Sequence, residues 1–358
     1  MKDILIPFAT GLAIFLFGLQ LIRIGLLDIA GERLRSMLLR FTKTPLRGFF
    51  TGILTTGFLQ SSSAVTVLLI SFVNAGLMSF SHSVGIILGT NVGTAVTTEI
   101  LALKIESFAL PMILGGAILR LLPWPQIAPL GLVLGGFGCI FLGMDTMQWI
   151  ATPLQDRGWV SWLLELGGDP IWSGVAIGTL LTAIIQSSSA TIAITMGFFA
   201  TGVITLPFAA AVVLGSNVGT CVTGLLAAIG STRTAKQVAI AHLILNIGGV
   251  LIFIPGIPLL IGAATLLSSH PPAQVAHIQT LFNLICSLLV LPFTTSFARG
   301  ITWLLPEEKV DWHRSEKPRK EKQKKKEEVH LQNPIPTLEL APSSKKGPPN
   351  RMTFLRRR

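Results

Sequence analysis

The stretch "LQSSSAV", residues 59–65, places four hydrogen-bonding side chains, Gln60 to Ser63, in the middle of an apolar segment. A second copy, "IQSSSAT", occupies residues 185–191. A polar group that loses water without gaining a partner costs free energy in an apolar environment. The same polar cluster in two apolar segments therefore predicts two related places where these groups meet each other, a ligand or an ion.

The serine clusters belong to a longer internal repeat. The sequence reads "GTNVGTAVT" at 89–97 and "GSNVGTCVT" at 215–223. Gln60 and Gln186 are 126 positions apart, and so are Asn91 and Asn217. Two motifs that recur at one fixed distance indicate a duplicated structural unit.

The composition is that of a membrane protein. Half of the residues are hydrophobic and 13% are charged, against about 25% charged residues in soluble domains. The mean hydropathy is +0.67. The net charge of +11 owes much to a C-terminal segment with fifteen Lys or Arg and eight Asp or Glu from Glu307 onward. Beside an apolar domain, such a segment favours a cytoplasmic tail near anionic lipid over a nucleic-acid-binding region.

Apolar segments long enough to cross a bilayer, about 20 residues, predict seven full spans. These are 4–27, 84–103, 107–122, 127–150, 206–229, 235–262 and 275–304. Two further apolar segments, 46–76 and 172–203, carry the serine clusters at their centres. Each half has about 14 residues and, at about 1.5 Å per residue, reaches only the middle of the membrane. Both segments are therefore predicted to be re-entrant helical hairpins.

Basic residues predict the orientation. Arg33, Arg35, Arg40, Lys43 and Arg47 follow the first span, and cytoplasmic loops are rich in Lys and Arg. The loop 151–171 is more acidic and is expected outside. The N-terminus is then external and the tail cytoplasmic, in the cell membrane. Since one repeat contains an odd number of spans, the second copy is inverted, as in many secondary transporters.

We therefore expect an all-α integral membrane protein with an inverted repeat. The first repeat is 1–126, with hairpin 46–76. The second repeat and the final spans are 127–304, with hairpin 172–203. Residues 305–358 are expected to form a disordered, basic cytoplasmic tail, because they are poor in apolar residues and rich in Lys, Glu and Pro.

The two glycines of each G-x-N-V-G-T motif predict a broken helix, because glycine weakens a helix by about 1 kcal/mol relative to alanine. Such a break exposes amide groups that attract anions and carbonyl groups that coordinate sodium. The alternative is that Gly, Ser and Thr only let membrane helices pack closely. The duplication of both motifs at one spacing favours the functional interpretation.

At these residues the chain resembles the sodium–phosphate cotransporter family. The two Q-S-S-S clusters and the two G-x-N-V-G-T stretches carry this resemblance, which extends over nearly all of 4–304. It implies sodium-dependent symport of inorganic phosphate by alternating access, with Na⁺ as coupling ion and no other cofactor. Phosphate, sodium and membrane lipid are the expected partners; nucleic acid is not, and a homo-oligomer stays open.

The resemblance also implies a binding centre at the hairpin tips. Its residues in the first repeat are Gln60, Ser61, Ser62, Ser63, Asn91 and Thr94, and in the second Gln186, Ser187, Ser188, Ser189, Ser216, Asn217, Thr220 and Thr223. Sodium ligands would be Gln60, Gln186, Ser216, Thr220 and backbone carbonyls. The family commonly has two His-x-x-x-Asn pairs. Here His242 and Asn246 form one, and Gln replaces His in the other, Gln279 to Asn283.

Three further points stay open. His242 and Asn246 share a helix face and either bond between helices or touch the substrate path. Glu99 is either a functional acid within a membrane segment or, because it lies close to a span end, a residue that reaches the lipid headgroups. The same scaffold could serve another oxyanion, an exporter or a passive anion channel. An intramembrane serine hydrolase is a remote alternative, because all three serines are duplicated and a G-x-S-x-G elbow is missing; we expect no enzyme.

Overall fold

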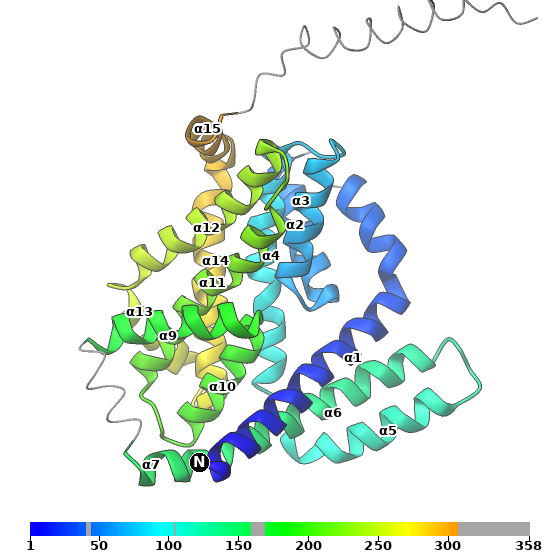
Figure 1. Cartoon of the computed structure of the whole chain (residues 1–358), viewed down its shortest axis with the longest axis vertical. Helices are drawn as coiled ribbons and strands as arrows, with labels where there is room; N and C mark the ends of the chain where they lie inside the picture. The colour runs from blue at the N-terminus through cyan, green and yellow to red at the C-terminus, as the bar shows by residue number, and fades with distance from the viewer. Residues whose placement is uncertain (41–43, 104, 159–168, 307–358) are drawn as a thin grey trace, which may run out of the picture. The chain divides into compact units, whose positions relative to one another are not determined.

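The computed structural model describes residues 1–40, 44–103, 105–158 and 169–306, and the regular structure in these ranges is helical. The predicted disordered tail lies outside the described residues. The helices are α1 (Lys2–Arg40), α2 (Pro45–Leu59), α3 (Ser62–Asn74), α4 (Phe80–Leu101), α5 (Ala109–Leu121), α6 (Ala128–Gln148), α7 (Ala151–Asp156), α9 (Pro170–Ile185), α10 (Ser188–Ala200), α11 (Leu206–Ala227), α12 (Arg233–Phe253), α13 (Ile257–Leu267), α14 (Pro271–Val290) and α15 (Thr294–Leu304) (Figure 1).

Six of the described helical segments, rather than the predicted seven, are long and apolar enough to cross a membrane. The predicted span 107–122 contains only the 13 residues of α5, about 20 Å of helix. The predicted span 235–262 is divided into α12 and α13 around Pro255 and Gly256, because proline cannot continue the hydrogen-bond ladder.

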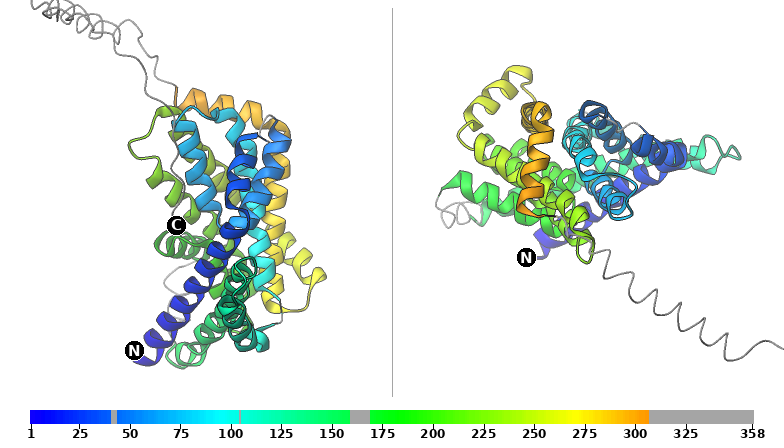
Figure 2. Two further views of the ribbon diagram at one scale, coloured as in Figure 1. Left: turned by 90° about the vertical axis from the view of Figure 1, so that its right-hand side faces the viewer. Right: turned by 90° about the horizontal axis from the view of Figure 1, so that it is seen from above.

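The last apolar segment also changes direction. Leu291–Phe293, which contains Pro292, forms a 3₁₀ turn between α14 and α15. Figure 2 shows α15 lying across the end of α14 rather than continuing it. Trp303 on α15 is 84% exposed, whereas Ile301 is buried. This two-sided helix is typical of the membrane–water interface.

Both predicted hairpins are helix–turn–helix units. The arms are α2 with α3 and α9 with α10, and they meet at Gln60 and Gln186. Figure 1 shows α3 leaving its tip toward the top of the view and α10 leaving its tip toward the bottom. Accordingly, Asn74 at the end of α3 accepts a hydrogen bond from the amide of Thr232, whereas Thr201 after α10 accepts one from Gln155. The two units are therefore inverted relative to each other.

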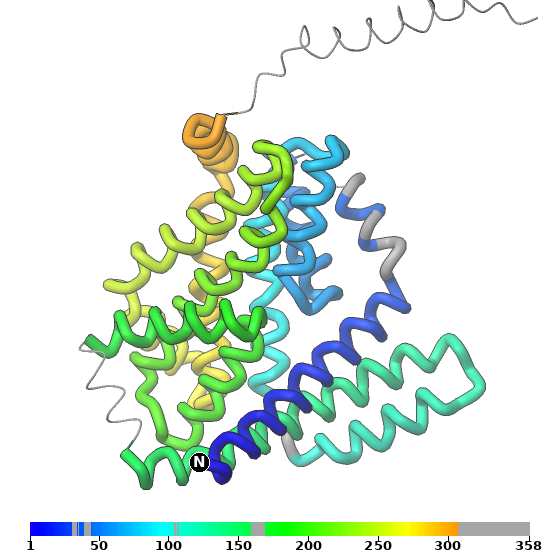
Figure 3. The backbone as a smooth tube through the Cα atoms, viewed as in Figure 1, coloured from blue at the N-terminus to red at the C-terminus, as the bar shows by residue number. Residues whose placement is uncertain are grey.

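The prediction that the G-x-N-V-G-T motifs break their helices is wrong. α4 and α11 are continuous helices of 22 residues each, and Figure 3 traces both without interruption. The glycines serve close packing instead. A methyl group on Gly89 would lie 2.0 Å from the carbonyl oxygen of Phe49 in α2, and one on Gly215 would lie 2.0 Å from that of Val175 in α9. The alternative of small residues for close helix approach accounts for the glycines.

Candidate functional site

The two hairpin tips meet around one small polar cavity. Eight of its ten lining residues are the two complete Q-S-S-S clusters, and Thr94 and Thr97 of α4 are the other two. The members of the first cluster are Gln60, Ser61, Ser62 and Ser63, and those of the second are Gln186, Ser187, Ser188 and Ser189. Segments more than 100 residues apart in sequence therefore build a single polar cavity, which we call the tip pocket.

Each tip has the same local structure. Gln60 and Gln186 end the first arms in the left-handed region, with φ of 51° and 57°. The serine that follows, Ser61 or Ser187, then caps the second arm, where its hydroxyl accepts a hydrogen bond of 3.2 Å from the amide of Ala64 or Ala190. A serine cap satisfies one of the amide groups that a helix leaves free in its first turn.

The capping geometry directs two helix N-termini at the tip pocket. α3 begins at Ser62 and α10 at Ser188, and both residues line the cavity. First-turn amides have no acceptor inside their own helix, and the helix dipole gives this end a partial positive charge. None of the ten lining side chains carries a charge. The pocket thus offers amide and hydroxyl donors to an anion, together with amide and hydroxyl oxygens to a hard cation.

Thr97 lines the tip pocket although sequence reasoning did not select it. Its hydroxyl is buried and has no hydrogen-bond partner among the described residues. The neighbouring Thr94 instead donates to the carbonyl oxygen of Thr90. The internal repeat could have identified Thr97, because this residue lies 126 positions before Thr223, which was selected as a site residue.

Five selected residues do not line the tip pocket: Asn91, Ser216, Asn217, Thr220 and Thr223. The hydroxyls of Ser216 and Thr220 donate within α11 to the carbonyls of Val213 and Ser216. The hydroxyl of Thr223 is buried and has no partner among the described residues. The two halves of the site are therefore unequal, since α4 lines the cavity and α11 does not.

The two motif asparagines contact other helices. Asn91 Oδ1 lies 3.3 Å from Nε2 of His242 on α12. Asn217 and Gln279 of α14 exchange hydrogen bonds of 2.9 and 3.2 Å. His242 and Gln279 thus bond between helices, which answers the question that the sequence left open for His242.

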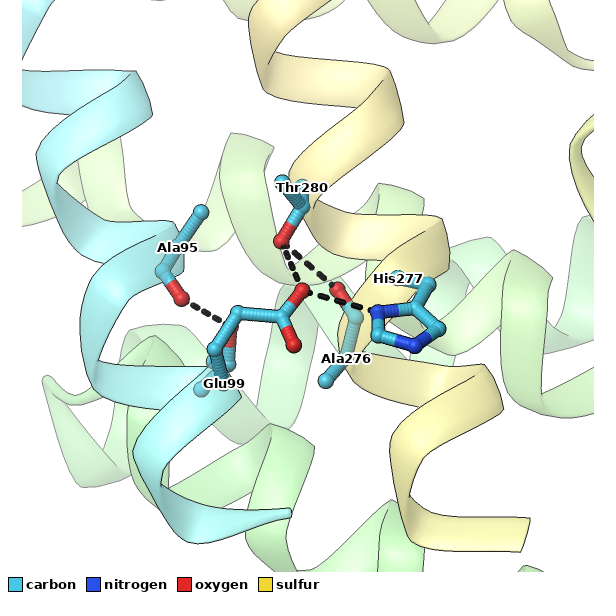
Figure 4. A network of polar contacts seen from close by, with 6 residues as sticks. Ala95, Glu99, Ala276, His277 and Thr280 are labelled. Atoms are coloured by element: carbon cyan, nitrogen blue, oxygen red, sulfur yellow. Dashed lines mark hydrogen bonds and ion pairs between the residues drawn. The ribbon is translucent and has the colours of Figure 1, made fainter. Parts of the chain in front are cut away.

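The acid that the sequence singled out, Glu99, joins α4 to α14 (Figure 4). Its Oε1 lies 3.0 Å from Nδ1 of His277 and 2.5 Å from the hydroxyl of Thr280. The side chain of Glu99 is 34% exposed and that of His277 is 23% exposed. Glu99 sits on the same helix as Thr94 and Thr97, and its contacts with His277 and Thr280 help to hold that helix against α14.

Comparison with known proteins agrees with this architecture. The model of the Na⁺/Pi-cotransporter family matches residues 14–149 and 158–267. "Uncharacterized protein YqeW" of Bacillus subtilis (strain 168) is 40% identical over 303 residues, which are 85% of this chain and 99% of that protein. No solved structure matches the chain.

Two relatives have names that refer to phosphate. The "Putative inorganic phosphate export protein YjbB" of Escherichia coli (strain K12) is 29% identical over 306 residues, or 85% of this chain. The match covers 56% of that protein, so the chain spans little more than half of its length. The "Sodium-dependent phosphate transport protein 2A" of Oryctolagus cuniculus is 46% identical over 59 residues, which are 16% of this chain and 9% of that protein.

The family match covers most of the chain, and the match to YqeW covers that protein almost from end to end. Together with six membrane-length helices, these matches show that the chain is a multi-pass membrane protein of the Na⁺/Pi-cotransporter family.

Proposed function

We propose that the protein transports inorganic phosphate across the cell membrane, with Na⁺ as the coupling ion, and that phosphate binds in the tip pocket. The observation that carries this proposal is the pair of helix N-termini, Ser62 of α3 and Ser188 of α10, at one uncharged polar cavity. Backbone amides and serine hydroxyls at helix N-termini are a general solution for binding phosphate.

The absence of charged side chains among the ten lining residues gives a physical reason for ion coupling. A divalent phosphate ion that leaves water needs compensating positive charge, and two helix ends supply only about +0.5 each. Sodium bound beside phosphate supplies the remainder. The amide oxygens of Gln60 and Gln186 are suited to this role, because Na⁺ favours neutral and anionic oxygen ligands.

Two inverted tips around one cavity also fit alternating access. In this proposal, the site is exposed to one side of the membrane at a time while the inverted halves exchange roles. Family membership and the name of transport protein 2A support sodium-dependent transport of phosphate. The name of YjbB favours a second candidate, phosphate export on the same scaffold.

Transport by the purified full-length chain in proteoliposomes tests both candidates. With sodium-driven symport, ³²P-phosphate accumulates against its gradient when sodium is high outside, and potassium or choline does not replace sodium. Equal accumulation in all three salts would reject sodium coupling. Sodium-independent efflux from preloaded vesicles would favour export, and movement only down the phosphate gradient would indicate a channel.

A further inference from the structure

The motif asparagines occupy equivalent places in the two repeats, and their partners lie on the later helices α12 and α14. Asn91 and Asn217 are 126 positions apart. Each contacts a residue that is followed, four positions later, by another asparagine. Asn91 contacts His242, which precedes Asn246 in "HLILN". Asn217 contacts Gln279, which precedes Asn283 in "QTLFN". We call the contacts Asn91–His242 and Asn217–Gln279 the two clamps.

The second clamp is deeply buried, and in the first clamp His242 is buried whereas Asn91 is half-buried. The exposed fraction is 1% for His242, 0% for Gln279 and 6% for Asn217. Placing polar side chains there costs free energy unless their hydrogen bonds are made. The amide pair of the second clamp makes two such bonds, at 2.9 and 3.2 Å. That geometry fixes the orientation of both side chains and the separation of α11 from α14.

The clamps form part of a wider set of cross-links. Asn246 of α12 donates to Sγ of Cys221 on α11, so α12 contacts both motif helices. Ser287 of α14 donates to the carbonyl oxygen of Leu88 on α4 at 3.0 Å, so α14 contacts both motif helices as well. α12 and α14 therefore hold α4 and α11 at defined rotations about their axes.

Rotation of α4 matters for the tip pocket. Asn91 precedes the pocket residues Thr94 and Thr97 by one and two helical turns, on one continuous helix. A turn of α4 that moves these threonines also breaks the contact with His242. In enzymes, a misplacement of about 1 Å caused by a distant mutation can cost about a hundredfold in rate, and a binding pocket depends on the placement of its groups in the same way.

α11 does not line the pocket, but its Gly215 packs against Val175 of α9, and α9 ends at the pocket residue Gln186. The first clamp thus acts on the pocket through α4, and the second through α11 and the α9 arm packed against it.

We propose that His242 and Gln279 are positioning residues for the phosphate pocket, and that each acts through the motif asparagine of one repeat. This inference rests on the proposed function. A polar pair that only joins two helices contributes to stability and leaves ligand affinity unchanged. Positioning predicts an additional loss of apparent affinity for phosphate.

The test compares Gln279→Leu with Gln237→Leu in the full-length chain. Both glutamines are 0% exposed, and Gln237 also bonds across elements, since its Nε2 donates to the carbonyl oxygen of Leu305. Among the described residues, Gln237 bonds neither Asn91 nor Asn217, so Gln237→Leu is a matched control. Phosphate uptake is measured in proteoliposomes, and thermal unfolding is measured in detergent. Gln279→His retains a hydrogen-bonding group, as found at the first clamp, and serves as the rescue variant.

We expect both leucine variants to lose thermal stability to a similar degree. Gln279→Leu alone should raise the KM for phosphate, roughly tenfold or more, and Gln279→His should stay within about threefold of wild type. An unchanged KM in Gln279→Leu, an equal rise in Gln237→Leu, or a rise in Gln279→His as large as in Gln279→Leu would each overturn the inference. A wild-type chain that transports no phosphate would instead reject the proposed function.

Discussion

At the level of single residues, Thr97 is the residue of the tip pocket with an unsatisfied polar atom. Its hydroxyl is buried, lines the cavity and has no hydrogen-bond partner among the described residues. A buried hydroxyl without a partner costs about 1–3 kcal/mol. A bound ion removes this cost, so the missing partner indicates where ligand binding is favourable.

Thr97→Val should therefore weaken phosphate or sodium binding while leaving the fold intact. Loss of one hydrogen bond to a charged ligand is worth about 1.5–3 kcal/mol, which corresponds to roughly tenfold or more in affinity. Ligand-induced thermal stabilisation of the purified protein, titrated with phosphate and with sodium, measures this effect.

Thr90→Val is the matched control on the same helix. The hydroxyl of Thr90 is equally buried, donates to the carbonyl oxygen of Ile87 at 2.7 Å and does not line the cavity. This substitution should leave both ligand titrations unchanged. Similar losses of affinity in the two variants would argue against a direct contribution of Thr97.

At the level of elements, pairs of helices packed through glycine hold the site. α2 lies against α4, and α9 against α11, at distances that leave no room for a methyl group at Gly89 or Gly215. Gly52 and Gly178 face the same contacts from the hairpin arms. Because these approaches are between backbones, each first arm and its motif helix form a rigid pair that ends at the tip pocket.

Gly89→Ala should be strongly destabilising, because its new methyl group would lie 2.0 Å from the carbonyl oxygen of Phe49. Overpacking costs about 1–3 kcal/mol or more, and thermal unfolding in detergent detects a loss of this size.

Gly248→Ala in α12 provides the contrast, since nothing lies within 4 Å of a methyl group there. Alanine favours a helix over glycine by about 1 kcal/mol, so this variant should be at least as stable as wild type. If Gly89→Ala unfolded at the wild-type temperature, the close packing of α2 on α4 would not be required.

The helical hairpins could be predicted from sequence because their signal is local. Arms of about 14 residues with a polar centre reach half of a bilayer and no further. The continuity of α4 could not be predicted from the motif alone, because the cost of Gly89 and Gly93 is offset by packing against α2, a contact between distant segments. For the same reason, sequence placed Asn91 and Asn217 at the pocket, whereas their partners on α12 and α14 are set by the tertiary structure.

For the whole molecule, the distribution of Lys and Arg predicts which side of the membrane each terminus lies on. Arg233 and Lys236, in the first turn of α12, and the basic tail are expected on the cytoplasmic side, and the N-terminus on the opposite side. The inverted arrangement of the two hairpins requires that the two tips enter from opposite sides of the membrane, whichever side is the cytoplasm.

Cysteine labelling tests the orientation. Lys2→Cys and, separately, Ser344→Cys are introduced into a chain in which Cys139, Cys221 and Cys286 are replaced. A membrane-impermeant maleimide should modify position 2 in intact cells and position 344 only after permeabilisation. The reverse pattern would show the opposite orientation. Labelling of both positions in intact cells would place both ends outside and would favour an even number of crossings, such as the six described membrane-length helices alone would give.

The backbone of the tips has a further consequence for engineering. Gln60 and Gln186 are the described residues other than glycine with positive φ, a conformation that costs a non-glycine residue of order 1–3 kcal/mol. Glycine at either tip would relieve that strain but would delete an amide that lines the cavity. Selection for thermostable variants would therefore favour glycine at these two positions. The selected protein would be more stable but would lack a side-chain amide that lines its binding pocket.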